Sequence, residues 1–291
     1  MPSRPAADKT KPPLLLAGVM GYPIAHSRSP RLHGYWLGRH GIAGAYLPLL
    51  VAAQDLPKAL AALPALHFRG CNLTLPHKEA ALKLVDRLDP QARRIGAVNT
   101  VVVQEDGSLE GRNTDAFGFI EALKQAQPKF RTKGAKAVVI GAGGAARAVV
   151  AALADAGAAQ IVLVNRSRER AETLARDLGG PIVLRSWDER HAALKEAALL
   201  VNTTSQGMQG QPPLDLALDA LAPSAVVSDA VYVPLQTPLL AAAAKRGNPI
   251  VDGLGMLLHQ ARQGFAEWFG VEPQVDEALR RHVAGDLMGQ G

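Results

Sequence analysis

The sequence predicts an α/β protein of two domains, for three reasons. Apolar runs of strand length alternate with amphipathic or Ala-rich stretches along the 291 residues, which is typical of α/β folds. The length is about twice that of a common domain. A Lys-rich connector from Gln127 to Lys136 separates two such alternations. We therefore expect two compact units with a cleft between them.

The first unit is expected to alternate strands with helices. Ser29-Pro30 predicts a helix start, with Ser29 as the N-cap residue, and Gly41 predicts the end of that helix. Asp106-Gly107 predicts a hairpin, and Thr114 with Asp115 predicts the start of a further helix. Strands are expected at 14–20, 45–51, 69–75, 98–104 and 108–112, and helices from 29 toward 41, at 55–63 and at 77–88.

The second unit is expected to be a doubly wound, Rossmann-like parallel sheet, whose ligands lie beyond the carboxyl ends of the strands. Ala-rich helices separate its strands, and the helical stretch from Leu254 to Phe269 and beyond is expected to return to the first unit. The strands are expected at 135–140, 160–164, 182–184, 199–201, 225–228 and 250–251. The expected domains are 1–114 for substrate, 115–252 for a dinucleotide, and 253–291 as C-terminal helices.

Composition narrows the class of protein. Hydrophobic residues make up 48% of the chain and charged residues 20%, which suits a globular protein with a buried core. The only cysteine, Cys71, excludes an intrachain disulfide, and we interpret it as a buried strand residue rather than a nucleophile. The histidines show no metal-ligand spacing, so no metal is expected. A cytoplasmic location fits best.

The net charge of +6 could indicate a nucleic-acid partner, but the arginines are scattered and aromatic residues are only 4%. We expect no nucleic acid and, because no apolar run approaches the roughly 20 residues of a membrane span, no membrane. Residues 1–13 are interpreted as a polar tail, and a signal peptide is the less favoured alternative. The sequence leaves open a monomer or a homodimer.

A dinucleotide fingerprint follows the first strand of the second unit. Gly141-Ala142-Gly143-Gly144-Ala145-Ala146 has the form G-x-G-x-x-A between a strand and a helix. Gly141 permits the tight turn, Gly143 lets a pyrophosphate approach the backbone, and Ala146 allows close helix packing. The helix N-terminus attracts the phosphates. We expect nucleotide binding at Gly141, Gly143, Gly144 and Ala145, and a ligand-free Gly-rich turn is the alternative.

The end of the next strand favours NADP over NAD. In NAD-binding folds a carboxylate at this point binds the ribose 2′-hydroxyl, and this strand ends without one. The residues that follow it are Asn165-Arg166-Ser167-Arg168-Glu169-Arg170. Arg166 and Arg170, four residues apart, are expected on one face at the start of a helix, where both can reach a 2′-phosphate. A solvated basic helix face is the alternative.

Three polar segments of the first unit lie where strands are expected to end. They are 27–30, 72–78 and Asn99 with Asp115. Each could consist of ordinary turn and cap residues. Lys78, however, stands at the start of an expected helix, where its charge opposes the helix dipole and stabilises nothing. The combination indicates a polar site at a cleft mouth.

With these segments the sequence resembles the shikimate dehydrogenase family from Val19 to about Gly270. The similarity rests on residues 21–30, 72–78, 96–100, 113–115, the Gly141 loop, 165–167 and 252–256, in the order of the family. It implies reversible reduction of 3-dehydroshikimate to shikimate with NADP(H). Lys78 and Asp115 would be the catalytic pair, because a positioned ammonium can stabilise a developing oxyanion and deliver its proton.

The resemblance also implies the binding residues. Ser27 and Ser29, with Thr74 and Tyr232 nearby, would bind the substrate carboxylate. Asn72, Asn99, Asp115 and Gln260 would hold ring hydroxyls. Besides the Gly141 loop, the cofactor would contact Asn165, Arg166, Ser167, Arg170, Thr203, Val231, Gly253 and Met256.

Two alternatives remain open at this point. A quinate or quinate/shikimate dehydrogenase shares the same motifs and tolerates one more ring hydroxyl. A non-catalytic nucleotide-sensing protein would keep the fold without the chemistry, and the presence of both Lys78 and Asp115 argues against it.

Overall fold

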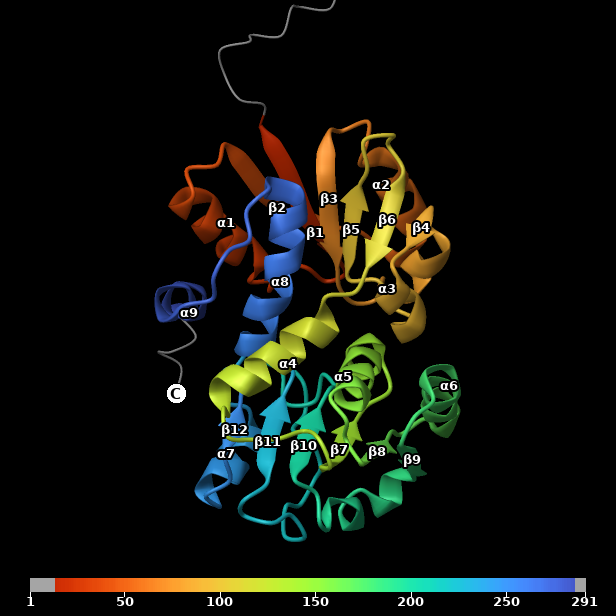
Figure 1. Cartoon of the computed structure of the whole chain (residues 1–291), viewed down its shortest axis with the longest axis vertical. Coiled ribbons are helices and arrows are strands. Elements are labelled where there is room, and N and C mark those ends of the chain that lie inside the picture. Colours follow the sequence, from red (N-terminus) through yellow and green to blue (C-terminus); the bar gives the residue numbers. More distant parts are fainter. Residues whose placement is uncertain (1–13, 286–291) are drawn as a thin grey trace, which may run out of the picture.

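The computed structural model describes residues 14–285, so the prediction of an N-terminal tail at 1–13 lies outside the described residues. Two six-stranded sheets form the described part of the chain, one above the other in Figure 1. This confirms an α/β fold of two units. Helix α4, Asp115–Ala126, lies between the two sheets, and α8, Gly253–Phe269, runs from there along the upper sheet.

The upper sheet is mixed and has the order β2-β1-β3-β5-β6-β4. Strand β1 is parallel to β2 and β3, whereas β5 is antiparallel to β3 and β6. Its elements are β1 Leu15–Gly21, α1 Ser29–Arg39, β2 Gly44–Leu50, α2 Leu56–Ala62, β3 Phe68–Leu73, β4 Arg87–Leu88, α3 Pro90–Ile95, β5 Thr100–Val103 and β6 Leu109–Arg112.

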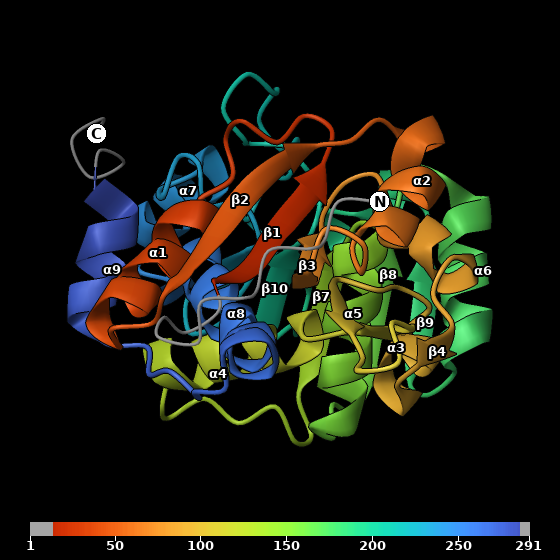
Figure 2. The same ribbon diagram turned by 90° about the horizontal axis from the view of Figure 1, so that it is seen from above.

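Helices cover both faces of the upper sheet. An apolar cluster that includes Val19, Leu32 and Phe265 joins one face to α1 and α8. A second cluster, which includes Met20, Leu60 and Leu73, joins the other face to α2. The neighbours Val19 and Met20 belong to opposite clusters, as the alternation of side chains along a strand requires. Figure 2 shows α1 and α9 on the opposite side of the molecule from α2 and α3.

The lower sheet is parallel throughout, with the order β12-β11-β10-β7-β8-β9. Strand order therefore reverses between β7 and β10, the switch point at which doubly wound sheets bind ligands. Its elements are β7 Lys136–Ile140, α5 Gly144–Asp155, β8 Gln160–Val164, α6 Arg168–Leu178, β9 Ile182–Arg185, β10 Leu199–Asn202, β11 Val226–Asp229, α7 Pro238–Lys245 and β12 Ile250–Val251. The predicted Rossmann-like sheet is confirmed.

Helices α4, Asp115–Ala126, and α8, Gly253–Phe269, pack against each other where the chain passes between the sheets. A Cβ on Gly118 would lie only 2.6 Å from Cβ of Gln260, so the close approach requires glycine there. After α8 the chain reaches α9, Glu277–Ala284, which packs on α1. The C-terminal helices thus return to the first unit, as expected. The boundaries at 114/115 and 252/253, which coincide with the N-caps of α4 and α8, stay a prediction.

One predicted helix is wrong. Residues 77–88 form a 3₁₀ turn at Ala80–Lys83 and the short strand β4 instead of a helix, and α3 follows unpredicted. Neighbouring segments capture the backbone: Asp86 N–H donates to Leu109 O and Asp89 N–H to Gly111 O. Pairing with β6 therefore overrides the helical apolar pattern.

The cap assigned to Ser29 is also wrong. Helix α1 begins at Ser29 itself, with Arg28 at the N-cap position and without a side-chain cap bond. The Ser29 side chain is therefore left for other contacts. Gly41, with a φ of 63°, follows the C-cap residue as expected.

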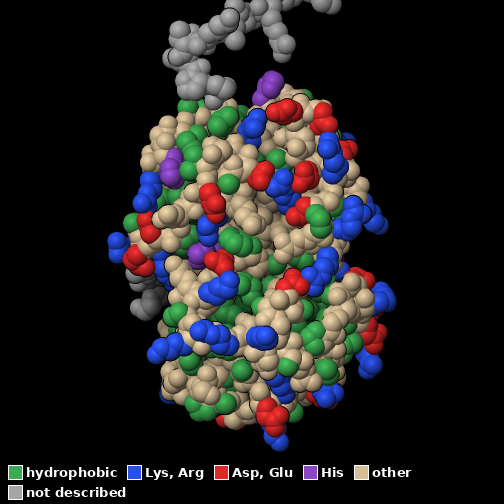
Figure 3. Space-filling view, in the orientation of Figure 1, with side chains coloured by type: hydrophobic (Ala, Val, Ile, Leu, Met, Phe, Trp, Pro, Cys, Tyr) green, Lys and Arg blue, Asp and Glu red, His purple; other side chains and the backbone are tan. Residues whose placement is uncertain are grey.

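Surface charge is mixed. On the face shown in Figure 3, Lys and Arg side chains alternate with Asp and Glu, and the basic groups form no single patch. Within residues 14–285 no helix combines the length and apolar character needed to cross a membrane.

Candidate active site

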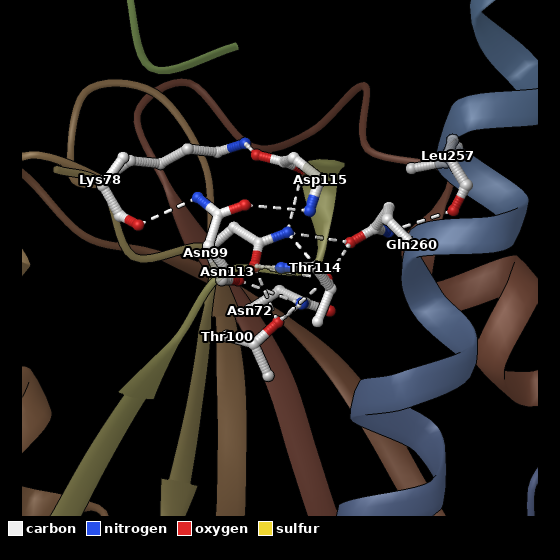
Figure 4. A network of polar contacts seen from close by, with 10 residues as sticks. Asn72, Lys78, Asn99, Thr100, Asn113, Thr114, Asp115, Leu257 and Gln260 are labelled. Carbon is white, nitrogen blue, oxygen red and sulfur yellow. Dashed lines mark hydrogen bonds and ion pairs between the residues drawn. The ribbon is translucent and has the colours of Figure 1, made fainter. Parts of the chain in front are cut away.

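The side chains of Lys78 and Asp115 meet between the two units. Lys78 Nζ lies 2.5 Å from Asp115 Oδ2, and their side chains are 18% and 6% exposed. Lys78 follows β3, while Asp115 is the first residue of α4 and favourably placed at the positive end of its dipole. Figure 4 shows the two meeting above the strand ends. The structure thus brings together two residues that are 37 positions apart.

Asn99 is the centre of the surrounding network. Its amide nitrogen can donate to Asp115 Oδ1 at 2.8 Å and to Gln260 Oε1 at 3.2 Å. Its Oδ1 accepts from Thr114 N–H and from the Thr100 hydroxyl. Two predicted hydroxyl-binding residues, one directly before β5 and one from α8, therefore converge on the predicted catalytic carboxylate, as Figure 4 shows.

Asn72 lies on the opposite side of this network, at the end of β3. Its amide nitrogen donates to Asn99 O at 3.0 Å and to Thr100 Oγ1 at 3.1 Å. Its Oδ1 accepts from the hydroxyl of Tyr46 at 2.6 Å. Thr74, two residues further on, is half-buried, and its backbone N–H donates to Met20 O.

The predicted carboxylate-binding residues lie at the start of α1 and in the loop after β11. Ser29 is buried, and its backbone N–H donates to Ser27 Oγ at 3.3 Å. Burial raises the pKa of the Tyr232 phenol, and a hydrogen bond to the Arg28 backbone together with the Arg28 charge opposes that rise. Tyr232 packs against the same apolar cluster as α1. The start of α1 and the loop after β11 therefore both contribute hydroxyl groups to the predicted carboxylate site.

The glycine loop has the geometry of a phosphate cradle. Gly141 has a φ of 114°, which glycine adopts readily, and a Cβ there would lie 2.6 Å from Thr203 Oγ1. Gly143 is the N-cap of α5 without a side-chain cap bond, and a Cβ on it would meet no described atom within 4 Å. Because an α-helix leaves its first N–H groups without intrahelical partners, the start of α5 can bind an anion. Gly144 and Ala145 form the first turn of this helix.

Lys78 touches this loop. A Cβ on Gly144 would lie 3.4 Å from Lys78 Cδ, so the lysine stem packs against the start of α5. Arg147 adds a second link, because its guanidinium donates to Ile95 O at the end of α3. The predicted catalytic pair and the predicted pyrophosphate loop are therefore adjacent.

Two arginines follow β8, but they do not share a helix face. Arg166 lies in the loop before the N-cap residue Ser167, whereas Arg170 belongs to α6. Both are exposed, and Arg170 reaches Glu79 at 3.5 Å across the gap between the units. Asn165 Nδ2 donates to Ser167 O and so braces the loop. Arg166 makes no ion pair with any described residue.

The remaining predicted cofactor residues line the ends of β10, β11 and β12. Thr203 Oγ1 donates to Ile140 O at 2.7 Å, which fixes it beside the glycine loop. Val231 N–H donates to Asp229 Oδ1. Gly253 lies against Ala230 O, where a Cβ would come within 2.4 Å, and Met256 lines a small cavity with Asp229 and Asp252.

Several residues of the site have no clear sequence signal. Thr100 and Thr114 complete the shell of Asn99, and Asp229 holds three segments together at the end of β11. Tyr46 lies within an apolar strand, so nothing in the sequence marks its hydroxyl. Asn113, whose Oδ1 accepts from Asp115 N–H, is signalled only by the polar 113–115 run.

Other candidate chemical groups lie outside the network. Cys71 is fully buried, and burial raises the pKa of its thiol, in agreement with a structural role. His77 Nε2 contacts Val51 O at 2.9 Å, and burial lowers the pKa of His77. Among residues 14–285, no three His, Cys, Asp or Glu side chains are grouped as metal ligands would be.

Each of the two units matches a known protein family. Residues 19–101 match the family described as shikimate dehydrogenase substrate binding domain. Residues 123–209 match the family described as shikimate / quinate 5-dehydrogenase. The two matches follow the order of the units along the chain.

Whole-chain relatives agree with these matches. A shikimate dehydrogenase (NADP(+)) of Paramagnetospirillum magneticum is 64% identical over 268 residues, which cover 92% of this chain and 97% of the relative. A crystal structure of shikimate 5-dehydrogenase from Thermus thermophilus, in complex with NADP(H) and shikimate, has a TM-score of 0.83 at 39% identity and covers 94% of this chain and 100% of that one.

A quinate dehydrogenase from Corynebacterium glutamicum in complex with NAD has a TM-score of 0.85 at 31% identity, covering 94% of this chain and 99% of that one. Fold alone therefore does not separate shikimate from quinate enzymes. Sequence identity does favour one of them, since the NADP(+) shikimate enzyme shares about twice as many residues with this chain. On the combined matches, the chain belongs to the shikimate dehydrogenase family.

Proposed function

We propose that the chain interconverts 3-dehydroshikimate and shikimate with NADP(H), and that Lys78 and Asp115 carry the proton transfer. The observation that carries this assignment is the contact between Lys78 Nζ and Asp115 Oδ2 at 2.5 Å beside the glycine loop of α5. A ligand bound on that loop and a ring held by the Asn99 network would then be neighbours.

The cofactor site fits NADP(H) in this chain. Helix α5 begins after Gly143 with no side-chain cap bond, which leaves its first N–H donors for a pyrophosphate. No carboxylate stands at the end of β8, and Arg166 and Arg170 lie just beyond it for a 2′-phosphate. A nicotinamide and its ribose would contact the residues that follow the neighbouring strands, which are Thr203, Val231, Gly253 and Met256.

The substrate site offers hydroxyl and amide groups of complementary kinds. Ser27, Ser29 and Tyr232 supply hydroxyl groups for a carboxylate, and Thr74, which follows β3, supplies another. Asn72, Asn99 and Gln260 supply amide groups for ring hydroxyls. Because these groups are mostly buried, their hydrogen bonds form in a medium of low effective dielectric and are stronger than in water.

Residues of the chain supply the proton that the carbonyl oxygen of the substrate needs. NADPH, when bound, supplies a hydride to the ring carbonyl carbon. The Lys78 ammonium stabilises the negative charge that develops on the carbonyl oxygen and donates a proton to it. The Asp115 carboxylate accepts a hydrogen bond from Lys78, while Asn99 Nδ2 holds its other oxygen in place. In the reverse direction Lys78 takes the proton of the shikimate hydroxyl.

Lys78→Ala tests this assignment. Loss of a positioned acid–base group typically costs about 10² to 10⁴ in rate, so kcat for shikimate oxidation should fall by that range while NADP⁺ affinity changes little. Initial rates and nucleotide titration measure the two quantities. Lys124→Ala, an exposed lysine on α4, is the matched control and should behave as wild type. An unchanged kcat for Lys78→Ala would remove Lys78 from the mechanism.

We also propose that the protein acts in the cytoplasm as a monomer or a homodimer. The single cysteine, buried in β3, is compatible with a reducing compartment. Sedimentation of the purified chain distinguishes the two states of assembly.

A further inference from the structure

The hydroxyl of Tyr46 is buried beside the substrate network, although Tyr46 belongs to the edge strand β2. The residue is 6% exposed, and its Oη lies 2.6 Å from Asn72 Oδ1. The Ser29 hydroxyl also hydrogen-bonds the phenol, and it opposes the rise in the pKa of Tyr46 that burial causes. One phenol thus contacts two residues assigned to substrate binding.

The direction of these hydrogen bonds is determined by the partners. Asn99 O can only accept, so the Asn72 nitrogen must face it, and the Asn72 oxygen must face Tyr46. The Tyr46 hydroxyl therefore donates its proton to Asn72. Both N–H bonds of the Asn72 amide are used by Asn99 O and Thr100 Oγ1, which leaves one lone pair of Oδ1 for a ligand.

The chain of donors continues to the catalytic pair. Asn72 Nδ2 donates to Thr100 Oγ1, and the Thr100 hydroxyl donates to Asn99 Oδ1 at 3.0 Å. Asn99 Nδ2 donates to Asp115 Oδ1. Hydrogen bonds therefore run in one direction from β2 across β3 and β5 to the carboxylate that contacts Lys78.

The ring of Tyr46 is held rigidly. His33 stacks on it with a centroid distance of 3.9 Å and an interplanar angle of 3°, and Trp268 lies at 6.0 Å. Burial lowers the pKa of His33 to about 3, and neither of its ring nitrogens has a hydrogen-bond partner among the described residues. His33 thus serves as a neutral aromatic plate that leaves the phenol little freedom to turn.

We propose that Tyr46 is a positioning residue that fixes Asn72 as a hydrogen-bond acceptor for a ring hydroxyl of the substrate and orients Asn99 through Thr100. This proposal rests on the proposed function and deepens it. Without the Tyr46 proton, the Asn72 amide is held only through the two hydrogen bonds of its nitrogen, and Oδ1 loses the donor that fixes its position for the ligand.

Tyr46→Phe removes only this hydroxyl. A neutral hydrogen bond contributes about 0.5 to 1.5 kcal/mol, so KM for shikimate should rise roughly two- to tenfold. We expect kcat and KM for NADP⁺ to change by less than about twofold, since the direct contact between Lys78 and Asp115 and the glycine loop do not involve Tyr46. Tyr35→Phe on α1, whose hydroxyl accepts a hydrogen bond from the exposed Arg39, is the matched control and should leave all three constants unchanged.

A double-mutant cycle separates positioning from packing. If Tyr46 acts through Asn72, then Tyr46→Phe should have no further effect on KM in an Asn72→Ala background. A role in packing alone would give the same loss in both backgrounds. Should Tyr46→Phe fail to fold, Thr100→Val breaks the next link of the chain and should raise KM for shikimate in the same way.

Two failures are distinguishable. If the wild-type protein forms no NADPH from shikimate, the proposed function is contradicted, and this result involves no variant of Tyr46. An active wild type with an unchanged shikimate KM in Tyr46→Phe, or with additive effects in the cycle, overturns the positioning role alone.

Discussion

The carboxylate of Asp229 joins three segments beside the proposed nicotinamide site. Its Oδ1 accepts from Asn202 Nδ2 and Val231 N–H, and its Oδ2 accepts from Thr237 Oγ1 at 2.7 Å. The side chain is almost completely buried, and this burial raises the pKa of Asp229 to about 6 against the pull of its three donors. Desolvation therefore outweighs hydrogen bonding at this residue.

This raised pKa predicts a pH-dependent stability. The folded protein binds the Asp229 proton more tightly than the unfolded chain does. The corresponding stabilisation is complete below about pH 4 and is lost as the pH rises through about 6. A shift of about two pKa units corresponds to roughly 3 kcal/mol. Asp229→Asn removes the titration and keeps the contacts, because the amide can still accept from Val231 and donate to Thr237.

Urea unfolding across this pH range measures the effect. The free energy of unfolding of Asp229→Asn minus that of wild type should increase by about 2 to 3 kcal/mol between roughly pH 4 and pH 7. Asp188→Asn, at an exposed position, is the control for the general effect of removing one carboxylate. A flat difference for Asp229→Asn would contradict the raised pKa.

Residue types alone could not reveal the buried polar contacts of Tyr46 and Asp229. Tyr46 stands in a run that predicts an apolar strand, and Asp229 directly follows the strand predicted at 225–228. Each has a buried partner that is 26 or 27 positions away in the sequence. By contrast, the glycines of the 141–146 loop act through local backbone geometry. Their role is therefore predictable from the sequence.

At the scale of elements, the close packing of α4 on α8 brings Gln260 to Asn99. A Cβ on Gly118 would lie 2.8 Å from Gln260 N and 2.8 Å from Met256 O, in addition to the close contact with Gln260 Cβ. Two of these atoms belong to the backbone and cannot turn aside. The two helices would have to separate to admit even a methyl group.

Gly118→Ala should therefore destabilise the protein by about 1 to 3 kcal/mol, a typical cost of overpacking. It should also raise KM for shikimate, because Gln260 would move away from Asn99. Gly34→Ala in α1 is the matched control: a Cβ there meets nothing within 4 Å, so we expect a gain of about 0.5 to 1 kcal/mol from helix propensity. Thermal unfolding and steady-state kinetics check both variants, and an equal effect of the two would refute the packing argument.

The β8–α6 connection carries the expected choice of nucleotide. Arg166→Gln should weaken NADP⁺ binding by roughly tenfold or more, since a charge-assisted hydrogen bond is worth about 1.5 to 3 kcal/mol. NAD⁺ binding should change little. Arg168→Gln, two residues away, is the control, because Arg168 pairs with Glu172 along α6. Calorimetric titration with both nucleotides decides, and equal losses for NADP⁺ and NAD⁺ would contradict a phosphate contact.

Elements were predictable where local pattern and tertiary pairing agree. The strands of the lower sheet lie within one or two residues of the predicted ranges, since buried parallel strands are continuous apolar runs. The 77–88 segment failed because β6 captures its backbone, a contact over 20 residues that no local pattern reports. Lys78 does not start a helix either, because its backbone oxygen accepts from Val98 N–H. Its selection as a site residue agrees with its contact to Asp115.

Over the whole molecule, the site exists only where the two units meet. Lys78 and Asn99 come from the first unit, the glycine loop from the second, and Gln260 from the helix that returns. Buried links fix this arrangement: Lys78 packs against Gly144, and Arg147 of α5 bonds the end of α3. Sequence patterns predicted each part separately, and the family resemblance was needed to join them, because spacing along the chain does not report contacts between units.

Initial rates with shikimate and with quinate, each with NADP⁺ and with NAD⁺, test the central claim most directly. We predict that the wild-type protein reduces NADP⁺ with shikimate at the highest kcat/KM. Replacing NADP⁺ by NAD⁺ should lower kcat/KM by about tenfold or more, since the 2′-phosphate contacts are lost. Quinate, with one more ring hydroxyl, should react more slowly than shikimate with either nucleotide. Absence of any nucleotide reduction with shikimate, or a higher kcat/KM for quinate with NAD⁺, would contradict the account.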